Sequence, residues 1–193
     1  GTKVLPGITS TGWFPYGGDP GREASTIATW LQDAGYHTGH IGRYLNGYGI
    51  CGPEFVCINS NGEWPAGKPD PRLYIPPGWD SWQTLIDKST YKMYNYQMND
   101  NGTIVAYGSA EADYQTDVLA GRAAAFIDEG SAVGRPFYLE IDTFAPHVED
   151  PTVASAGRFA FSIRPAPRHA YLMDGFLFNG ELPLPIIKPS FNE

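Results

Sequence analysis

Two stretches of the sequence each predict a helix that runs directly into a short strand, and this order constrains the fold more than any other feature. In the first stretch, apolar residues recur at the spacing of one helix face, namely Ile27, Trp30, Leu31 and Ala34. Ser25 is a residue type that caps helix N-termini, and Gly35 is a type that ends helices. The strand is then expected over residues 37–41.

The second stretch repeats this order. Asp113 is expected to cap a helix that Gly130 ends, and the helical spacing is carried by Val118, Leu119, Arg122, Ala123, Phe126 and Ile127. An apolar strand is expected over residues 137–142.

A hairpin is predicted between the two stretches. Asn101-Gly102 is a strong signal for a two-residue turn, with strands expected over residues 91–98 and 103–107. Helix, strand, helix and strand with a side hairpin indicate the α/β class.

Ligands of α/β sheets bind beyond the carboxyl ends of the strands. Arg43 follows the first predicted strand and His147 follows the last. An arginine fork can hold a sulfate, phosphate or carboxylate through two parallel hydrogen bonds. A histidine can donate a proton to a leaving oxygen near neutral pH, although from spacing alone a histidine after a strand is more often structural.

The composition indicates a loop-rich globular protein. The 193 residues include 23 Gly and 17 Pro, yet also 5 Trp, 12 Tyr and 10 Phe, so the chain can bury apolar surface. We expect one domain with an irregular lead-in over residues 1–22, an α/β segment over 23–147 and a Pro-rich irregular tail over 148–193. A long functional loop or insertion is expected over 46–78.

The charge balance argues against general nucleic-acid binding. Lys and Arg number 13 against 21 Asp and Glu, which gives a net charge of −8. A duplex or an anionic membrane would be repelled by most of such a surface. No apolar run reaches the length of about 18 residues that a spanning helix needs.

Two weak signals together favour a secreted protein. Cys51 and Cys57 are spaced so that a small disulfide can form, although free thiols are also compatible with the sequence. Asn101-Gly102-Thr103 is a glycosylation sequon, which makes Asn101 a candidate acceptor.

The segment 26–48 reads TIATWLQDAGYHTGHIGRYLNGY. It resembles the second sulfatase signature, in which a helix is followed by Gly-Tyr-x-Thr and then by Gly-Lys and an aromatic residue. Its Tyr-Leu-Asn ending is similar to the N-acetylglucosamine-6-sulfatase and arylsulfatase branch. Further motifs similar to that branch follow in order, at Pro76–Trp82, Tyr94–Tyr96, Tyr114–Leu119, Ala145–His147, Pro165–His169 and Pro189–Glu193.

The resemblance implies hydrolysis of sulfate esters on an alkaline-phosphatase-like α/β fold. Sulfatases use a formylglycine made from a cysteine as nucleophile, and a bound calcium ion that orients and neutralises the sulfate. Arg43 falls where the family has a lysine that touches the sulfate, and His147 falls on the family's sulfate-binding histidine, a candidate for protonating the departing oxygen. Arginine keeps the charge of lysine but cannot give up a proton near neutral pH.

The nucleophile and the calcium ligands are expected outside these residues. The family's Cys-x-Pro-x-Arg motif lies upstream of the segment that resembles residues 23–48, where this chain has no cysteine. Residues 51–55 have the cysteine and proline offset, but Phe55 stands where the arginine is needed. Glu140 and Asp142 lie near the expected site, but acids at strand ends more often cap or pair, so no metal ligand is assigned.

Two further groups allow a functional and a structural interpretation. Arg168 and His169, with Arg158 and Arg164 nearby, would form either a rim that attracts a sulfated sugar or a solvated loop with local salt bridges. The aromatic residues would either stack on sugar rings or pack a sheet face, and they are Trp79, Trp82, Tyr91, Tyr94 and Tyr96.

We therefore expect an internal segment of a sulfatase catalytic domain, a sulfuric ester hydrolase acting on aryl or glucosamine sulfates. This chain would supply the cationic part of the sulfate pocket, through Arg43 and His147, and would be inactive alone. Its partners would be a sulfate ester or sulfated glycan and the remainder of the sulfatase chain. The alternative is a non-catalytic, sulfatase-derived protein that binds sulfated glycans.

Overall fold

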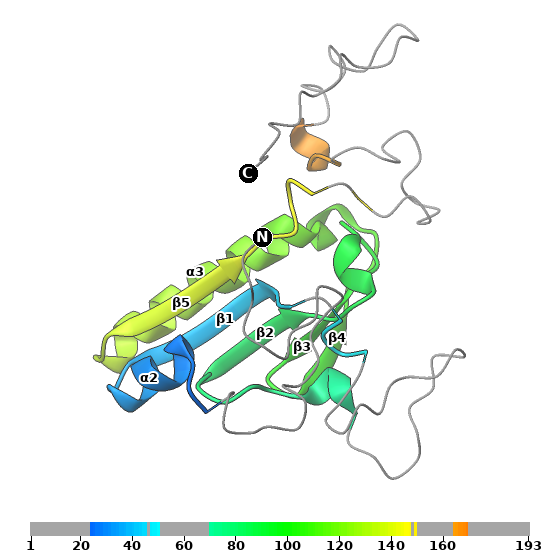
Figure 1. Cartoon of the computed structure of the whole chain (residues 1–193). Helices are drawn as coiled ribbons and strands as arrows, with labels where there is room; N and C mark the ends of the chain where they lie inside the picture. Colours follow the sequence, from blue (N-terminus) through cyan, green and yellow to red (C-terminus); the bar gives the residue numbers. More distant parts are fainter. Residues whose placement is uncertain (1–23, 46, 51–69, 148, 150–163, 170–193) are drawn as a thin grey trace, which may run out of the picture.

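The computed structural model describes residues 24–45, 47–50, 70–147, 149 and 164–169. They form a five-stranded mixed sheet in the order β4-β3-β2-β1-β5 (Figure 1), which confirms the α/β class. The strands are β1 (His37–Arg43), β2 (Ser81–Leu85), β3 (Gln97–Asp100), β4 (Thr103–Ala106) and β5 (Phe137–Asp142). The α-helices are α2 (Ile27–Asp33) and α3 (Gln115–Val133), and the 3-10 helices are η3 (Pro71–Leu73), η4 (Ser89–Tyr91), η5 (Glu111–Asp113) and η7 (Pro167–His169).

Within the described residues, no helix has the length and apolar character needed to cross a membrane.

Strands β1, β2 and β5 are parallel, so their carboxyl ends meet at one edge of the sheet. Gly42 of β1 is in register with Thr84 of β2 and with Asp142 of β5. The segments that follow β1 and β5 therefore begin side by side, as the sequence predicts. Helix α3 packs along β1 and β5, and α2 precedes the amino end of β1 (Figure 1).

The sequence analysis does not predict β2, although this strand lies at the centre of the sheet. Four of its five residues are buried: Ser81, Trp82, Thr84 and Leu85. A strand that is covered on both faces lacks the alternation of apolar and polar side chains by which strands are recognised in a sequence.

The N-cap of the first helix is Thr26, not Ser25. Thr26 and Thr29 form a capping box, in which the hydroxyl of each accepts a hydrogen bond from the backbone N–H of the other. The Ser25 hydroxyl instead accepts a hydrogen bond from the indole nitrogen of Trp30. The strand that follows is confirmed and extends to Arg43.

The predicted start and end of the second helix are wrong. Asp113 lies in η5, and the N-cap residue of α3 is Tyr114. Helix α3 continues through Gly130 and ends before Gly134, which has the left-handed conformation typical of helix ends. Gly130 serves packing instead, since a Cβ atom there would lie 3.1 Å from the ring of Phe137. The strand at 137–142 is confirmed.

The hairpin turn is confirmed, but its first strand is shorter than predicted. Asn101 and Gly102 have φ angles of 50° and 86°, as a tight turn between β3 and β4 requires. Tyr91 lies in η4, and β3 begins only at Gln97. Asn95, with a φ angle of 55°, interrupts the extended backbone between them.

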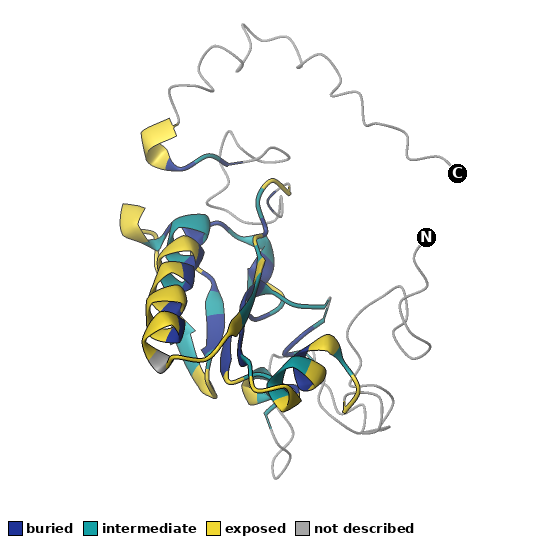
Figure 2. Ribbon diagram, turned by 90° about the vertical axis from the view of Figure 1, so that its left-hand side faces the viewer, coloured by how far each residue is buried: buried dark blue, intermediate teal, exposed yellow. Residues whose placement is uncertain are grey.

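The main core lies between α3 and the sheet, and Figure 2 shows the buried side of α3 turned toward the strands. Its buried members are Ile41, Leu85, Tyr96, Met98, Leu119, Ala123 and Phe126. The Phe126 ring lies against β1 at Gly39, where an added Cβ atom would be 2.4 Å from its Cε2 atom. Helix α3 can therefore approach the sheet this closely only because residue 39 has no side chain.

The opposite face of the sheet carries a second buried cluster, formed by Tyr48, Trp82 and Ile86. The Tyr48 hydroxyl accepts hydrogen bonds from Trp82 and Asn99 and donates one to the carbonyl of Tyr74. The ends of the long loop predicted over residues 46–78 thus pack on the sheet, while residues 51–69 lie outside the described part of the chain.

We expect Gly39→Ala to lower the free energy of unfolding by about 1–3 kcal/mol, because the new methyl group overlaps the Phe126 ring. Adding Phe126→Leu should recover part of this loss. Gly121→Ala is the matched control, since nothing lies within 4 Å of its added Cβ atom and it should stabilise α3 by about 0.5–1 kcal/mol. Urea unfolding measures all three variants. If Gly39→Ala leaves the free energy of unfolding unchanged, the close contact between residue 39 and the Phe126 ring is contradicted.

Asp80 connects four segments at the amino ends of the strands. Its carboxylate accepts hydrogen bonds from Gln32, from the backbone N–H of Thr38 and from Arg135, and lies 3.3 Å from Nδ1 of His37. Burial raises the pKa of this carboxyl, but the donors and the Arg135 charge outweigh burial and hold the Asp80 pKa below its usual value.

Because the folded pKa of Asp80 is depressed, the carboxylate stabilises the fold above the unfolded pKa of about 3.9, and this stabilisation is lost as the pH falls through the folded pKa. Asp80→Asn should therefore lower the free energy of unfolding more at neutral pH than at about pH 3. Urea unfolding at both pH values checks this, with exposed Asp128→Asn as control. An equal loss at both pH values would count against the interpretation.

Candidate functional site

A pocket of about 300 Å³ lies at the edge of the sheet where β1 and β5 end. It is lined by Arg43, Tyr44, Leu45, Glu140, Asp142 and Thr143. Gly42 allows the two strands to approach here, because it has a φ angle of 115° and an added Cβ atom would lie 2.1 Å from the Asp142 carbonyl oxygen. This approach places the two oppositely charged groups Arg43 and Asp142 in one small pocket.

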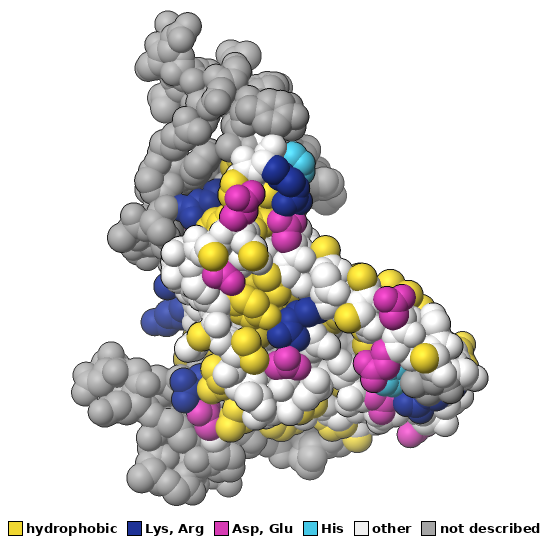
Figure 3. Space-filling model, turned by 180° about the vertical axis from the view of Figure 1, so that it is seen from behind, with side chains coloured by type: hydrophobic (Ala, Val, Ile, Leu, Met, Phe, Trp, Pro, Cys, Tyr) yellow, Lys and Arg dark blue, Asp and Glu magenta, His cyan; other side chains and the backbone are white. Residues whose placement is uncertain are grey.

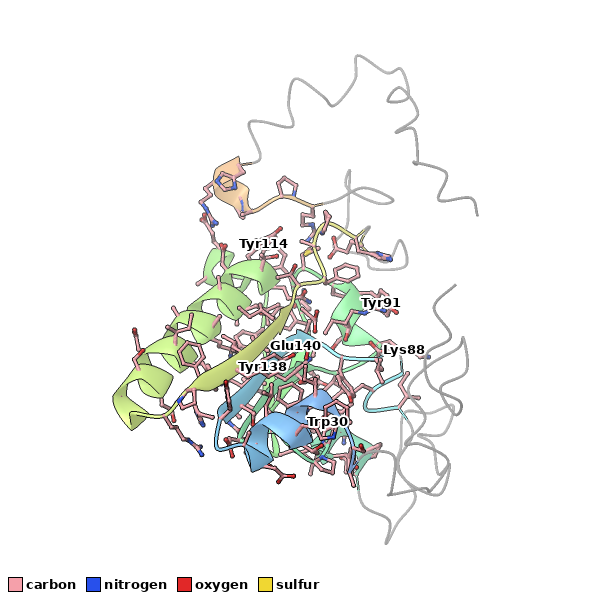
Figure 4. The ribbon with its side chains drawn as sticks, turned by 60° about the vertical axis from the view of Figure 1, so that its left-hand side comes forward. Trp30, Lys88, Tyr91, Tyr114, Tyr138 and Glu140 are labelled. Carbon is pink, nitrogen blue, oxygen red and sulfur yellow. The ribbon has the colours of Figure 1, made fainter. Side chains whose placement is uncertain are left out.

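Tyr91 brings the two predicted site residues together. Nη2 of Arg43 donates a hydrogen bond of 2.9 Å to the Tyr91 hydroxyl, and the guanidinium carbon lies 5.3 Å from the centroid of the Tyr91 ring. The His147 ring packs edge-on against the same ring, with centroids 6.0 Å apart, and lies 4.8 Å from the ring of Phe144. Tyr91 and Glu140 are both labelled in Figure 4, near the carboxyl end of β5. The sequence places Tyr91 in a strand and gives no sign of this contact.

The pocket also holds acidic groups, so it is not purely cationic. The nearby His40 imidazole, with a smaller contribution from the Arg43 charge, holds the pKa of Asp142 below its usual value. Burial and the neighbouring Asp142 raise the pKa of Glu140, although His40 opposes them. Asp87 does not line the pocket; burial raises its pKa, against the hydrogen bond from the Gly47 backbone and the charge of Arg43.

His40 is a site residue that the sequence analysis misses. It lies directly across from Glu140 in the parallel register of β1 and β5, and its Nε2 atom is 3.6 Å from Oδ2 of Asp142. One pattern could have indicated His40 as a site residue. Glu140 and Asp142 point to the same side of one strand, and His40 lies beside them on the neighbouring strand. That pattern needs the strand pairing, which the sequence alone does not provide.

Arg168 and His169, predicted to bind substrate, lie in η7. Arg168 forms a two-pronged ion pair with Asp117 of α3, and this pair lowers the pKa of Asp117. Neither Arg168 nor His169 is among the described residues that line the pocket containing Arg43. On the described part of the face in Figure 3, basic side chains lie beside acidic ones and form no broad basic surface.

Arg164 belongs to the interior rather than to a rim. Its Nε atom lies 3.1 Å from the carboxylate of Glu149, and both side chains are buried. Trp82, Tyr94 and Tyr96 are also buried, so they pack the core and are not available to stack on sugar rings.

The remaining candidates concern covalent modification. Asn101 is exposed at the tip of the hairpin, and its side-chain oxygen accepts a hydrogen bond from the backbone of Trp82. Glycosylation at Asn101 stays a prediction. Cys51 and Cys57 lie outside the described residues, as does Arg158, so the disulfide also stays a prediction.

Comparison with known proteins identifies relatives of one kind. No family model matches the chain. A Caenorhabditis elegans protein named as a homolog of extracellular sulfatase Sulf-1 is 38% identical over 142 residues, which are 72% of this chain and 17% of that protein. An extracellular sulfatase SULF-1 homolog of Drosophila melanogaster is 33% identical over 145 residues, or 74% of this chain and 11% of that protein.

An arylsulfatase of Volvox carteri is 29% identical over 154 residues, which are 77% of this chain and 20% of that protein. The chain thus spans a fifth or less of these three relatives, while the relatives cover most of the chain. The chain belongs to the sulfatase family.

Proposed function

We propose that this chain is part of the catalytic domain of a sulfuric ester hydrolase with an alkaline-phosphatase-like fold. In this proposal Arg43 and His147 bind the sulfate group of the substrate. The observation that supports it is the shared contact of Arg43 and His147 with Tyr91, at the carboxyl edge of the parallel strands. This is the edge at which α/β sheets bind ligands.

Arg43 would hold two sulfate oxygens through its planar fork and stabilise the negative charge that develops on them. His147 would donate a proton to the ester oxygen as the sulfur–oxygen bond breaks. Tyr91 acts as a positioning residue, because its hydroxyl accepts a hydrogen bond from Arg43 and its ring supports His147.

The described residues do not fit the calcium ion of the family. Calcium takes six to eight oxygen ligands, whereas the charged groups that converge here are two carboxylates and an imidazole nitrogen. We therefore derive no step through calcium, and we propose that its ligands and the formylglycine come from parts of the protein outside these 193 residues. The chain alone should then show no turnover.

We further propose that the protein acts outside the cell on a sulfated glycan or an aryl sulfate. Two of the relatives are named extracellular sulfatases, and two are named arylsulfatases. A disulfide between Cys51 and Cys57 and a glycan on Asn101 would be consistent with that location.

The first test is binding of a heparin-derived sulfated oligosaccharide to the chain, measured by calorimetry. Arg43→Gln and His147→Gln should each weaken binding about tenfold, because each removes a charge-assisted or polar contact to sulfate. Arg43→Lys should weaken it less. Arg135→Gln removes the same charge at the opposite end of the sheet and should have little effect, and Arg168→Gln shows whether η7 takes part.

Equal weakening by Arg135→Gln and Arg43→Gln would mean that the oligosaccharide responds only to net charge, which would contradict the assigned site. Hydrolysis of 4-methylumbelliferyl sulfate by the complete protein is the second readout. Glycan binding through Arg43 without turnover in the complete protein would favour the non-catalytic binding protein instead.

Tyr91→Phe tests the positioning role separately. The ring that supports His147 is retained, whereas Arg43 loses the acceptor of its 2.9 Å hydrogen bond. We expect oligosaccharide affinity to fall by roughly threefold to tenfold, while the free energy of unfolding changes by only about 1 kcal/mol. Calorimetry and urea unfolding check the two effects, and unchanged affinity would remove Tyr91 from the site.

A further inference from the structure

A buried imidazole in the sheet has one nitrogen without a hydrogen-bond partner. His40 is fully buried in the middle of β1, and its Nδ1 atom lies 2.7 Å from the Thr84 hydroxyl oxygen. Its other nitrogen, Nε2, makes no hydrogen bond with any described residue. A buried polar atom left in this way costs free energy, so its presence calls for a physical explanation.

Two carboxylates converge on this nitrogen. Glu140 lies across from His40 in the parallel register, and Asp142 follows two residues later on the same side of β5. The Oδ2 atom of Asp142 is 3.6 Å from Nε2 of His40. One oxygen of each carboxylate and one nitrogen of His40 all lie within 4.8 Å of one another.

The His40 ring is held in this orientation from several sides. It stacks on Trp82 with centroids 4.6 Å apart, and the edges of Tyr44 and Trp79 lie against it at 5.4 and 5.5 Å. Thr84 occupies Nδ1, so Nε2 is the nitrogen that points toward the acids. On the far side, the Tyr138 hydroxyl donates a hydrogen bond of 3.1 Å to Glu140.

This arrangement is the one that metal-binding histidines adopt in proteins. One ring nitrogen hydrogen-bonds to a neighbouring oxygen, which orients the ring, and the other nitrogen faces the metal. The carboxylate ligands of metals are likewise held by hydrogen bonds from outside the site. Thr84 and Tyr138 occupy these supporting positions.

We propose that His40, Glu140 and Asp142 bind a divalent transition-metal cation, with Zn²⁺ as the best match. Zinc takes imidazole nitrogen and carboxylate oxygen together at about 2.0–2.2 Å, which leaves a fourth position open toward the pocket. Calcium prefers oxygen ligands throughout and is a poor match for the imidazole. The site revises the sequence analysis, which assigns no ligand to Glu140 or Asp142, and it is independent of the proposed sulfatase activity.

The distances allow the site to close around an ion. Ligand atoms of a tetrahedral zinc site lie roughly 3–4 Å apart, so the carboxylates need to move inward only slightly from their present separation. The side chain of Asp142 is 48% exposed and has room to rotate. A dication would also balance the two negative charges, which otherwise face each other beside a buried ring.

The test is calorimetric titration of the chain with ZnCl₂, in a Cys51→Ser, Cys57→Ser background so that thiolates do not take the zinc. We expect one tight site, which excess CaCl₂ does not block. Asp142→Asn and Glu140→Gln should each raise the Kd by about tenfold or more, and Thr84→Val, which removes only a supporting contact, by roughly tenfold. Asp80→Asn is the matched control, because it alters the other histidine–aspartate pair of β1.

Nuclear magnetic resonance of the imidazole nitrogens supplies a second readout that needs no variant in the site. Zinc should shift the Nε2 resonance of His40 and leave the rings of His37 and His147 nearly unchanged. The proposal is overturned if zinc leaves the His40 resonance in place, or if Asp80→Asn weakens binding as much as Asp142→Asn does. Either result would mean that His40, Glu140 and Asp142 do not form the zinc site.

Discussion

The close parallel pairing of β1 with β5 is the contact on which the rest of the site depends. At Gly42 the two backbones approach so closely that no other residue could occupy the position, since its Cβ atom would collide with the carbonyl of Asp142. The pairing brings residues that lie a hundred positions apart in the sequence to one edge of the sheet. It sets His40 opposite Glu140 and places Arg43 in the lining of the pocket that also contains Glu140 and Asp142.

Aromatic side chains then turn this edge into a structured site. Trp82 and its neighbours hold the His40 ring, and Tyr91 holds Arg43 and His147. The pocket therefore combines one guanidinium with two carboxylates. A guanidinium beside two acids attracts a sulfate only weakly, whereas a dication bound by the acids would balance their negative charge and strengthen the attraction of the pocket for an anion. The two proposals are thus physically compatible, although each is tested by itself.

The sequence predicts the elements whose signal is local. The apolar stripe of α3 and the Asn101-Gly102 turn are confirmed, because helical spacing and the left-handed preference of these two residues do not depend on distant contacts. The errors are also local in part, since Ser25 is as suitable for capping as Thr26, and Asp113 is a more favourable capping type than Tyr114, whose side chain makes no capping hydrogen bond. Strand β2 is not predicted for another reason. Segments far away in the sequence bury both of its faces, so its residues lack the alternation of apolar and polar side chains that indicates a strand.

For the candidate site the division is similar. The motif series identifies the sulfatase family, and the order of helices and strands places Arg43 and His147 at the ends of neighbouring strands. The role of Tyr91 and the meeting of His40 with Glu140 and Asp142 follow only from the register of β1 against β5 and from the return of η4 over the sheet edge. Spacing along a chain encodes periodicity and turns, which are short-range properties. Contacts between side chains on different strands depend on how the backbone segments pack, and that is decided by the tertiary structure.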